Sequence, residues 1–218
     1  MGNPSDTCGG KTVSATVSNF WADVWLTAST SISFKPHPLY DPHEFGSLRE
    51  LAFTTGRDGY SGAQRLFLAT LRKLFVMAEA AGIDLPAKGF KVHFDTNIPR
   101  QVGLAGSSAL ITAFIKCLFR YWKLSKEQLE SLPSLVLAVE LQELNISAGL
   151  QDRVIQVYQG IVHMDFSPEL MKGVSYGRYT ELDPRPLPPL FLAYTLYPSD
   201  SGRIHAPIKQ RWEQKDAE

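Results

Sequence analysis

The chain has 218 residues, enough for one domain with a proper core and part of a second. Its 22 basic and 22 acidic residues cancel, so the charge indicates neither a nucleic-acid partner nor a membrane surface. No apolar run reaches membrane-spanning length and the N-terminus has no signal-peptide pattern, so we expect a cytoplasmic protein. Cys8 and Cys117 are expected to be free thiols. No Cys/His cluster has metal-ligand spacing, and no protein partner is indicated.

Hydrophobic periodicity predicts strands and helices along the first half of the chain. Residues 13–20 and 24–32 are rich in Val, Thr and aromatic side chains and predict a pair of strands. Apolar residues at helical spacing across 67–78 predict an amphipathic helix that ends at Gly82. The alternating segment Gly89–Thr96 predicts a further strand.

The second half predicts more helices. One carries an apolar face of Leu110, Phe114, Cys117, Leu118 and Tyr121. Ser125 and Gln128 form a capping box, and Pro133 occupies the first turn of the next helix. A helix at 150–158 and a strand at 161–166 follow.

A proline-rich segment divides the chain. Residues 182–189, L-D-P-R-P-L-P-P, contain four prolines in eight positions and predict a linker. A strand at 191–197 and a helix at 199–212 come after it, and two such elements alone do not bury their apolar faces. We therefore place one domain at residues 1–188 and the beginning of a second at 189–218.

The most informative segment is the loop at residues 97–109, N-I-P-R-Q-V-G-L-A-G-S-S-A, between the predicted strand and helix. Gly103 and Gly106 let the backbone approach a ligand closely. Ser107 and Ser108 are placed to cap the helix, whose N-terminal dipole and free N–H groups favour an anion such as phosphate. The loop matches neither G-x-x-x-x-G-K-[ST] nor G-x-G-x-x-G. The alternative is an ordinary helix N-cap with a glycine turn.

Two acids are candidates for the rest of a phosphoryl-transfer site, which needs a magnesium ligand and a group that orients or deprotonates the acceptor. Glu140 and Asp152 lie on two predicted helices joined by the turn at 145–149, an arrangement that can bring both to the loop. Glu143 competes with Glu140 as the metal ligand. Taken alone, each acid more commonly belongs to a solvated surface.

The loop resembles the phosphate loop of the GHMP kinases, whose usual core is G-L-[GS]-S-S-A; here Ala105 adds one residue. Glu140 and the run A-G-L-Q-D at 148–152 resemble the family's glutamate and its aspartate after a turn. G-N-P-S-D-T-C-G-G-K at 2–11 is similar to the first motif of the family, although a simple Asx-type turn also explains it. Segments 95–109, 148–166 and 198–212 resemble the glucuronokinase branch.

This resemblance implies an ATP-dependent sugar-1-kinase that uses Mg²⁺ and makes D-glucuronate 1-phosphate. It implies an α+β fold, the GHMP kinase N-terminal domain (similar to ribosomal protein S5 domain 2), with a left-handed βαβ crossover and an incomplete C-terminal domain. The implied phosphate-binding residues are Pro99, Gly103, Leu104, Ala105, Gly106, Ser107, Ser108 and Ala109. The implied metal ligands are Ser108 and Glu140, and the implied catalytic residues are Asp152, as base, and Lys11.

The resemblance also assigns the sugar site. Asn3 and Asp6 would bind sugar hydroxyls. Arg57, Arg100 and Arg153 are candidates for the uronate carboxylate, because an arginine pairs with a carboxylate through two parallel hydrogen bonds. We take Arg153 as the substrate-binding residue of the three.

The chain departs from the family at two places. The initial strand with its R-V-x-L-I-G segment and the glycine-rich motif of the C-terminal domain are both missing from the sequence. We therefore expect a chain with weak or no catalysis, prone to aggregate through residues 191–197. Two other functions stay open, a non-catalytic nucleotide-binding or regulatory fragment and a kinase for another sugar.

Overall fold

A computed structural model describes Asp6, residues 8–35, His37, and residues 64–86, 89–124, 131–172 and 176–194. The elements of the described residues are, in chain order, β1 Lys11–Ala15, β2 Ala22–Ser29, β3 Ser33–Phe34, α2 Gln64–Ala80, β4 Gly89–Thr96, α3 Gly106–Trp122, α4 Leu132–Ala138, the π-helical turn η1 Val139–Glu143, α5 Leu150–Tyr158, β5 Ile161–Asp165, α6 Pro168–Met171 and β6 Arg178–Leu182. The mixture of helices and largely antiparallel strands confirms the expected α+β class.

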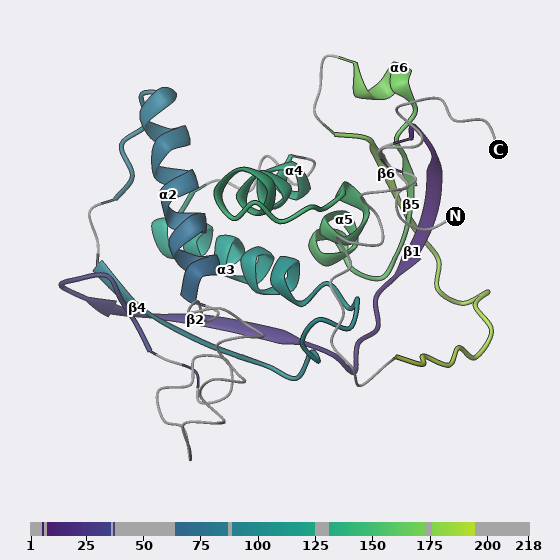
Figure 1. Cartoon of the computed structure of the whole chain (residues 1–218), viewed down its shortest axis with the longest axis horizontal. Coiled ribbons are helices and arrows are strands. Elements are labelled where there is room, and N and C mark those ends of the chain that lie inside the picture. The colour runs from purple at the N-terminus through teal and green to yellow at the C-terminus, as the bar shows by residue number, and fades with distance from the viewer. Residues whose placement is uncertain are drawn as a thin grey trace.

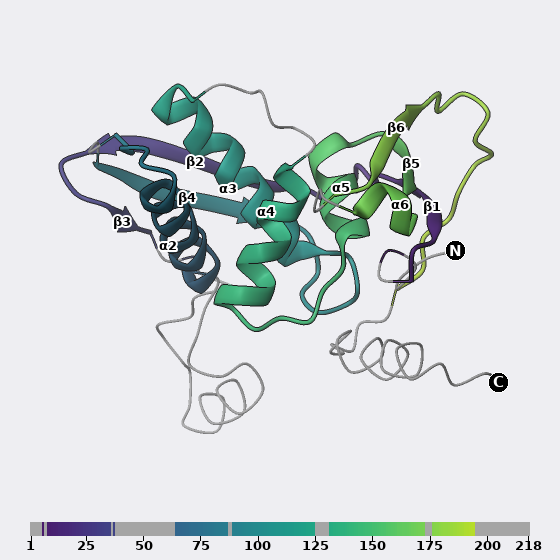
Figure 2. The ribbon, with the colours of Figure 1, turned by 90° about the horizontal axis from the view of Figure 1, so that it is seen from above.

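The strands form two small sheets, which Figures 1 and 2 show on different sides of the helices. One has the order β1-β5-β6 and is antiparallel throughout. The other has the order β2-β4-β3, in which β2 is antiparallel and β3 parallel to β4. The parallel pair is joined through α2, as the implied βαβ unit requires, and its handedness stays a prediction.

The prediction that the first two strands pair with each other is wrong. β1 pairs with β5, and β2 pairs with β4, so the two belong to different sheets. The link between them is held at both ends: the N–H of Thr16 donates to the carbonyl of Gly160, and the N–H of Trp21 donates to Oδ1 of Asn97 at 2.7 Å. These contacts draw the two strands toward different partners and replace the tight turn that a hairpin needs.

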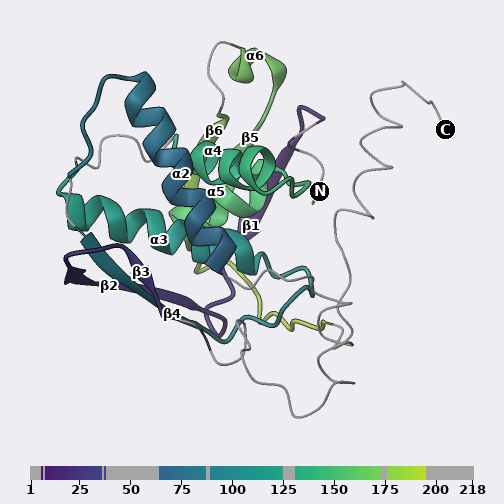
Figure 3. The ribbon, with the colours of Figure 1, turned by 60° about the vertical axis from the view of Figure 1, so that its left-hand side comes forward.

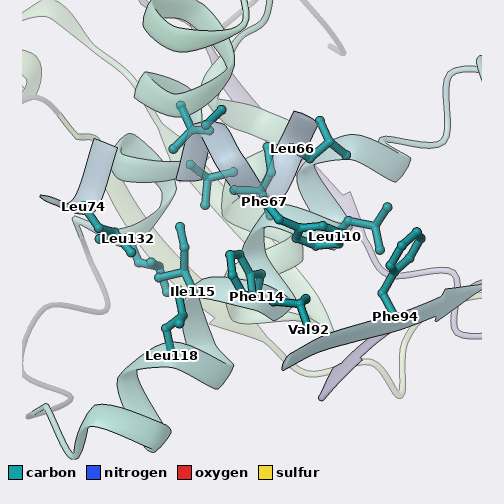
Figure 4. Close-up of a cluster of buried hydrophobic side chains, with 14 of the residues drawn as sticks. Leu66, Phe67, Leu74, Val92, Phe94, Leu110, Phe114, Ile115, Leu118 and Leu132 are labelled. Atoms are coloured by element: carbon teal, nitrogen blue, oxygen red, sulfur yellow. The ribbon is translucent and has the colours of Figure 1, made fainter. Parts of the chain in front are cut away.

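The main core lies between the β2-β4-β3 sheet and the helices above it (Figures 3 and 4). Phe67 of α2, Phe90 and Phe94 of β4 and Phe114 of α3 are all buried there, and the rings of Phe67 and Phe114 meet edge to face at 5.0 Å. Of the predicted α3 face, Leu110, Phe114 and Leu118 are buried, whereas Cys117 and Tyr121 are partly exposed. α3 is therefore held firmly between the sheet and its neighbouring helices.

Several other local predictions are confirmed. Strand β4 has the expected bounds, and α5 and β5 fall where the periodicity placed them. α2 ends at Ala80, and Gly82 stops it as expected: its positive φ of 65° lets the N–H of Ile83 donate to the carbonyl of Ala78 at 2.8 Å. No helix among the described residues is long and apolar enough to cross a membrane. The capping box at Ser125 and Gln128 lies outside the described residues.

After β6 the chain runs as an irregular, exposed segment to residue 194. The strand predicted at 191–197 is wrong over its described part, since neither sheet extends to residues 191–194. Phe191 is 98% exposed there. Among the described residues, no paired strand buries the apolar side chains of this segment. The helix predicted at 199–212 lies outside the described residues, and the domain division at residue 188 stays a prediction.

Candidate functional site

The loop between β4 and α3 is anchored at its start. The side chain of Asn97 accepts from the N–H of Trp21 and donates to the carbonyl of Asn19, both at 2.7 Å. The loop then turns through left-handed residues at every second position, Gln101, Gly103 and Ala105, with φ of 57°, 80° and 53°. Left-handed residues are a component of the backbone nests that bind anions. The implied phosphate-binding residues Pro99 and Gly103–Ala109 make up this turn and the first turn of α3.

The prediction that Ser107 and Ser108 cap α3 is wrong. The N-cap is Ala105, which makes no side-chain cap, and both serines lie inside the first helical turn. From there their hydroxyls face Glu140: Ser107 Oγ donates to Oε1 at 2.6 Å, and Ser108 Oγ lies 3.5 Å from both carboxylate oxygens. The side chains therefore join the helix start to an acid 32 or more positions away.

The π-helical turn η1 gives the two candidate glutamates different surroundings. It brings Glu140, which is 0% exposed, to the serines of α3. Glu143, on the same turn, pairs instead with Arg72 of α2. Single π-helical turns inside helices often occur at functional sites because the wider turn redirects side chains. The geometry supports Glu140 over Glu143 as the acid that serves the loop.

Arg153 is almost wholly buried and contacts both candidate acids. Its Nε donates to Oε2 of Glu140 at 2.6 Å and its Nη2 pairs with the same carboxylate. Its Nη1 donates to the carbonyl of Gly149 at 3.0 Å and lies 3.3 Å from Oδ2 of Asp152. The guanidinium assigned to the sugar carboxylate is thus occupied by protein groups. Asp152 itself, in the first turn of α5, keeps 37% of its side chain exposed.

Lys11 lies in an ion pair on the other sheet. β1 and β5 place Lys11 opposite Asp165, and Nζ is 2.7 Å from Oδ2. The Lys11 ammonium, with the backbone N–H of Ser167, lowers the pKa of Asp165 to about 2. The role of Lys11 beside Asp152 stays a prediction, as do the roles of the other candidate residues.

Asp6, predicted to bind a sugar hydroxyl, caps a helix here. It is 8% exposed and accepts from the N–H of Leu150 at the start of α5, with Gln151 Nε2 at 3.5 Å. The N-cap residue Gly149 has no side chain to do this, and a carboxylate also suits the positive end of the helix dipole. The N-terminal segment thereby fixes the helix that carries Asp152. Asn3 and Arg57 lie outside the described residues.

Replacing Gly149 by alanine is expected to destabilise the protein by about 1–3 kcal/mol, through a clash rather than backbone strain. A Cβ there would lie 2.4 Å from Oδ2 of Asp6, while its φ of −124° suits any residue. Thermal unfolding measures the effect. The matched control is Asp6→Ala with Gly149→Ala, in which the clash is absent and the second substitution should add little. An unchanged Tm in Gly149→Ala would contradict the cap.

The fold has known counterparts. Residues 65–160 match the family described as the GHMP kinases N terminal domain. The crystal structure of a D-glycero-D-manno-heptose 1-phosphate kinase from Bacteroides thetaiotaomicron is similar with a TM-score of 0.59 and 21% identity, over 83% of this chain and 54% of that one. A mevalonate kinase gives a TM-score of 0.50 and 15% identity, over 82% and 51%. The chain therefore contains the N-terminal domain of a GHMP kinase, as the loop predicted.

Within that class, two curated relatives from Arabidopsis thaliana carry a more specific name. "Probable glucuronokinase 2" is 46% identical over 218 residues, covering 99% of this chain and 59% of its own length. "Glucuronokinase 1" is 45% identical over 219 residues, covering 99% and 60%. The chain spans about three-fifths of the length of these relatives. The resemblance to the glucuronokinase branch is thereby confirmed.

Proposed function

We propose that the protein acts as an ATP-dependent sugar-1-kinase that converts D-glucuronate to D-glucuronate 1-phosphate. The observation that carries the proposal is the buried Glu140 facing the serine hydroxyls at the start of α3, beneath a glycine-containing turn. The names of relatives that are 45–46% identical across nearly the whole chain support the substrate. The N-terminus of a helix suits the phosphates of a nucleotide, and a nearby carboxylate suits the cation that accompanies them.

The donor set fits Mg²⁺ carried by ATP. Among the described residues, no group of three His, Cys, Asp or Glu side chains could hold a metal ion. The site instead offers Ser108 Oγ and the Glu140 carboxylate, which are oxygen ligands, and Mg²⁺ commonly uses one or two carboxylates together with substrate phosphates. Bound there, the ion would neutralise charge on the transferring phosphate. Pro99 and Gly103–Ala109 would hold the phosphates, partly through backbone N–H groups.

Asp152 would serve as the base. It lies in the first turn of α5 with its side chain partly exposed, and the adjacent Arg153 donates to the carboxylate of Glu140. In this role one oxygen of Asp152 takes the proton of the sugar C1 hydroxyl as the hydroxyl oxygen attacks the γ-phosphorus and ADP leaves. Lys11 would assist, and Asn3 and Asp6 would contact the sugar. The proposal includes a cytoplasmic location, which would suit free thiols such as Cys8 and Cys117.

The double substitution Ser107→Ala with Ser108→Ala is expected to weaken binding of ATP in the presence of MgCl₂. Each lost hydrogen bond to a charged group costs roughly 1.5–3 kcal/mol, which corresponds to at least a tenfold rise in Kd. Isothermal calorimetry measures it. Ser131→Ala with Ser134→Ala, at the start of α4, is the matched control and should leave Kd nearly unchanged. Equal affinity in the wild-type protein and the loop variant would reject the loop as the phosphate site.

A coupled assay with a sugar panel tests the function itself. In the complete enzyme we expect D-glucuronate to be preferred over glucose and galactose by kcat/KM, because an arginine that pairs with the uronate carboxylate loses that ion pair when a neutral sugar binds. Equal kcat/KM for glucose and glucuronate would favour a kinase for another sugar. ATP binding without turnover of any sugar would favour the non-catalytic alternative.

A further inference from the structure

Arg153 joins the two acids that the proposed function uses. Its side chain is 6% exposed, and its Nε lies 2.6 Å from Oε2 of Glu140. Its Nη1 reaches the carbonyl of Gly149 at 3.0 Å and Oδ2 of Asp152 at 3.3 Å. One rigid guanidinium therefore contacts Glu140, Asp152 and the backbone of Gly149 in the turn between their helices.

The two oxygens of Glu140 have different surroundings. Oε2 accepts from Arg153, while Oε1 accepts from Ser107 at 2.6 Å, and Ser108 Oγ lies 3.5 Å from both oxygens. Glu140 is 0% exposed, so water does not readily replace the guanidinium at Oε2. Oε1 is thus the oxygen that contacts the two serine hydroxyls and is not paired with Arg153.

We propose that Arg153 is a positioning residue that restricts Glu140 to a one-oxygen ligand and so selects Mg²⁺ over Ca²⁺ in the nucleotide complex. The inference rests on the proposed function, because it takes Glu140 as a ligand of the cation that accompanies ATP. Mg²⁺ demands compact octahedral geometry, whereas Ca²⁺ takes about six to eight oxygens and often binds both oxygens of a carboxylate. A carboxylate with one oxygen occupied by an arginine suits the smaller ion.

The test is calorimetry of ATP binding to the 218-residue chain in MgCl₂ and in CaCl₂. The wild-type protein should bind ATP more tightly with Mg²⁺, and in Arg153→Met the ratio of the two Kd values should fall about tenfold as Oε2 becomes available. Arg72→Met is the matched control, since it removes the arginine paired with Glu143 on the same helical turn. Its ratio should stay within about twofold of the wild-type value.

Arg153→Met leaves the buried carboxylate of Glu140 unpaired, which strongly destabilises proteins. A second variant therefore keeps the inference testable if Arg153→Met does not fold. Arg153→Lys keeps the positive charge but loses the planar fork, and should lower the ratio by about threefold or more. A wild-type ratio in Arg153→Lys, or equal affinities with the two cations in the wild-type protein, would overturn the inference alone. No ATP binding with either cation would overturn the proposed function on which the inference rests.

Discussion

Replacing Asp152 by asparagine is expected to lower kcat by about two to four orders of magnitude, the usual contribution of a general base. Asparagine has nearly the same shape but does not accept the proton of the acceptor hydroxyl. Because Asp152 is partly exposed at the start of α5, the substitution should change stability little. Steady-state turnover of D-glucuronate by the complete enzyme measures kcat, and calorimetry of ATP binding shows whether the nucleotide site stays intact.

Asp183→Asn is the matched control for that experiment. Asp183 also pairs with an arginine, Arg185, but on the exposed segment after β6. Its substitution should leave kcat close to the wild-type value, since exposed pairs contribute little. Near-normal turnover in Asp152→Asn would place the base elsewhere, while an equal loss in both variants would indicate an effect unrelated to proton transfer.

Replacing Glu140 by glutamine is expected to lower the free energy of unfolding by about 3–5 kcal/mol, even without any ligand. The substitution leaves the Arg153 guanidinium buried beside a neutral amide, and the contacts to Ser107 lose their charge. For a chain of this size each kcal/mol corresponds to a fall of about 2–4 °C in Tm. Chemical denaturation and thermal unfolding of the ligand-free protein measure the change.

Glu143→Gln provides the comparison, because it removes a negative charge from the same helical turn. Its partner Arg72 is 69% exposed, so the pair is weakened by solvent and its loss should cost about 1 kcal/mol or less. A Glu140→Gln variant as stable as Glu143→Gln would show that the buried pair contributes no more than the exposed one. The structural assignment of Glu140 would then lose its energetic support.

The features of the fold that depend on residues close together in the sequence were predictable. Strand Gly89–Thr96 and helix Leu150–Tyr158 follow from apolar spacing, and the end of α2 just before Gly82 follows from glycine's access to positive φ. The loop was recognised because its glycines and serines form a compact pattern between a strand and a helix. The choice of Glu140 over Glu143 came from the resemblance to the family, because the spacing from Glu143 to Asp152 is shorter than the family's.

Features that depend on distant partners were not predictable. β1 pairs with β5, some 150 residues away, and no local signal distinguishes that pairing from a hairpin with β2. The left-handed N-cap at Ala105 turned the serines into the helix, where a cap position had been expected. The pairing of Arg153 with Glu140 crosses a π-helical turn and a loop, so helical spacing did not reveal it.

The most direct test of the central claim is a crystal structure with a non-hydrolysable ATP analogue, MgCl₂ and D-glucuronate. Our account predicts phosphate oxygens at the turn of residues 103–108, the cation on Ser108 and Oε1 of Glu140, and the sugar C1 hydroxyl within hydrogen-bonding distance of Asp152. A nucleotide bound away from this turn, with Glu140 still paired only with Arg153 and the serines, would contradict it.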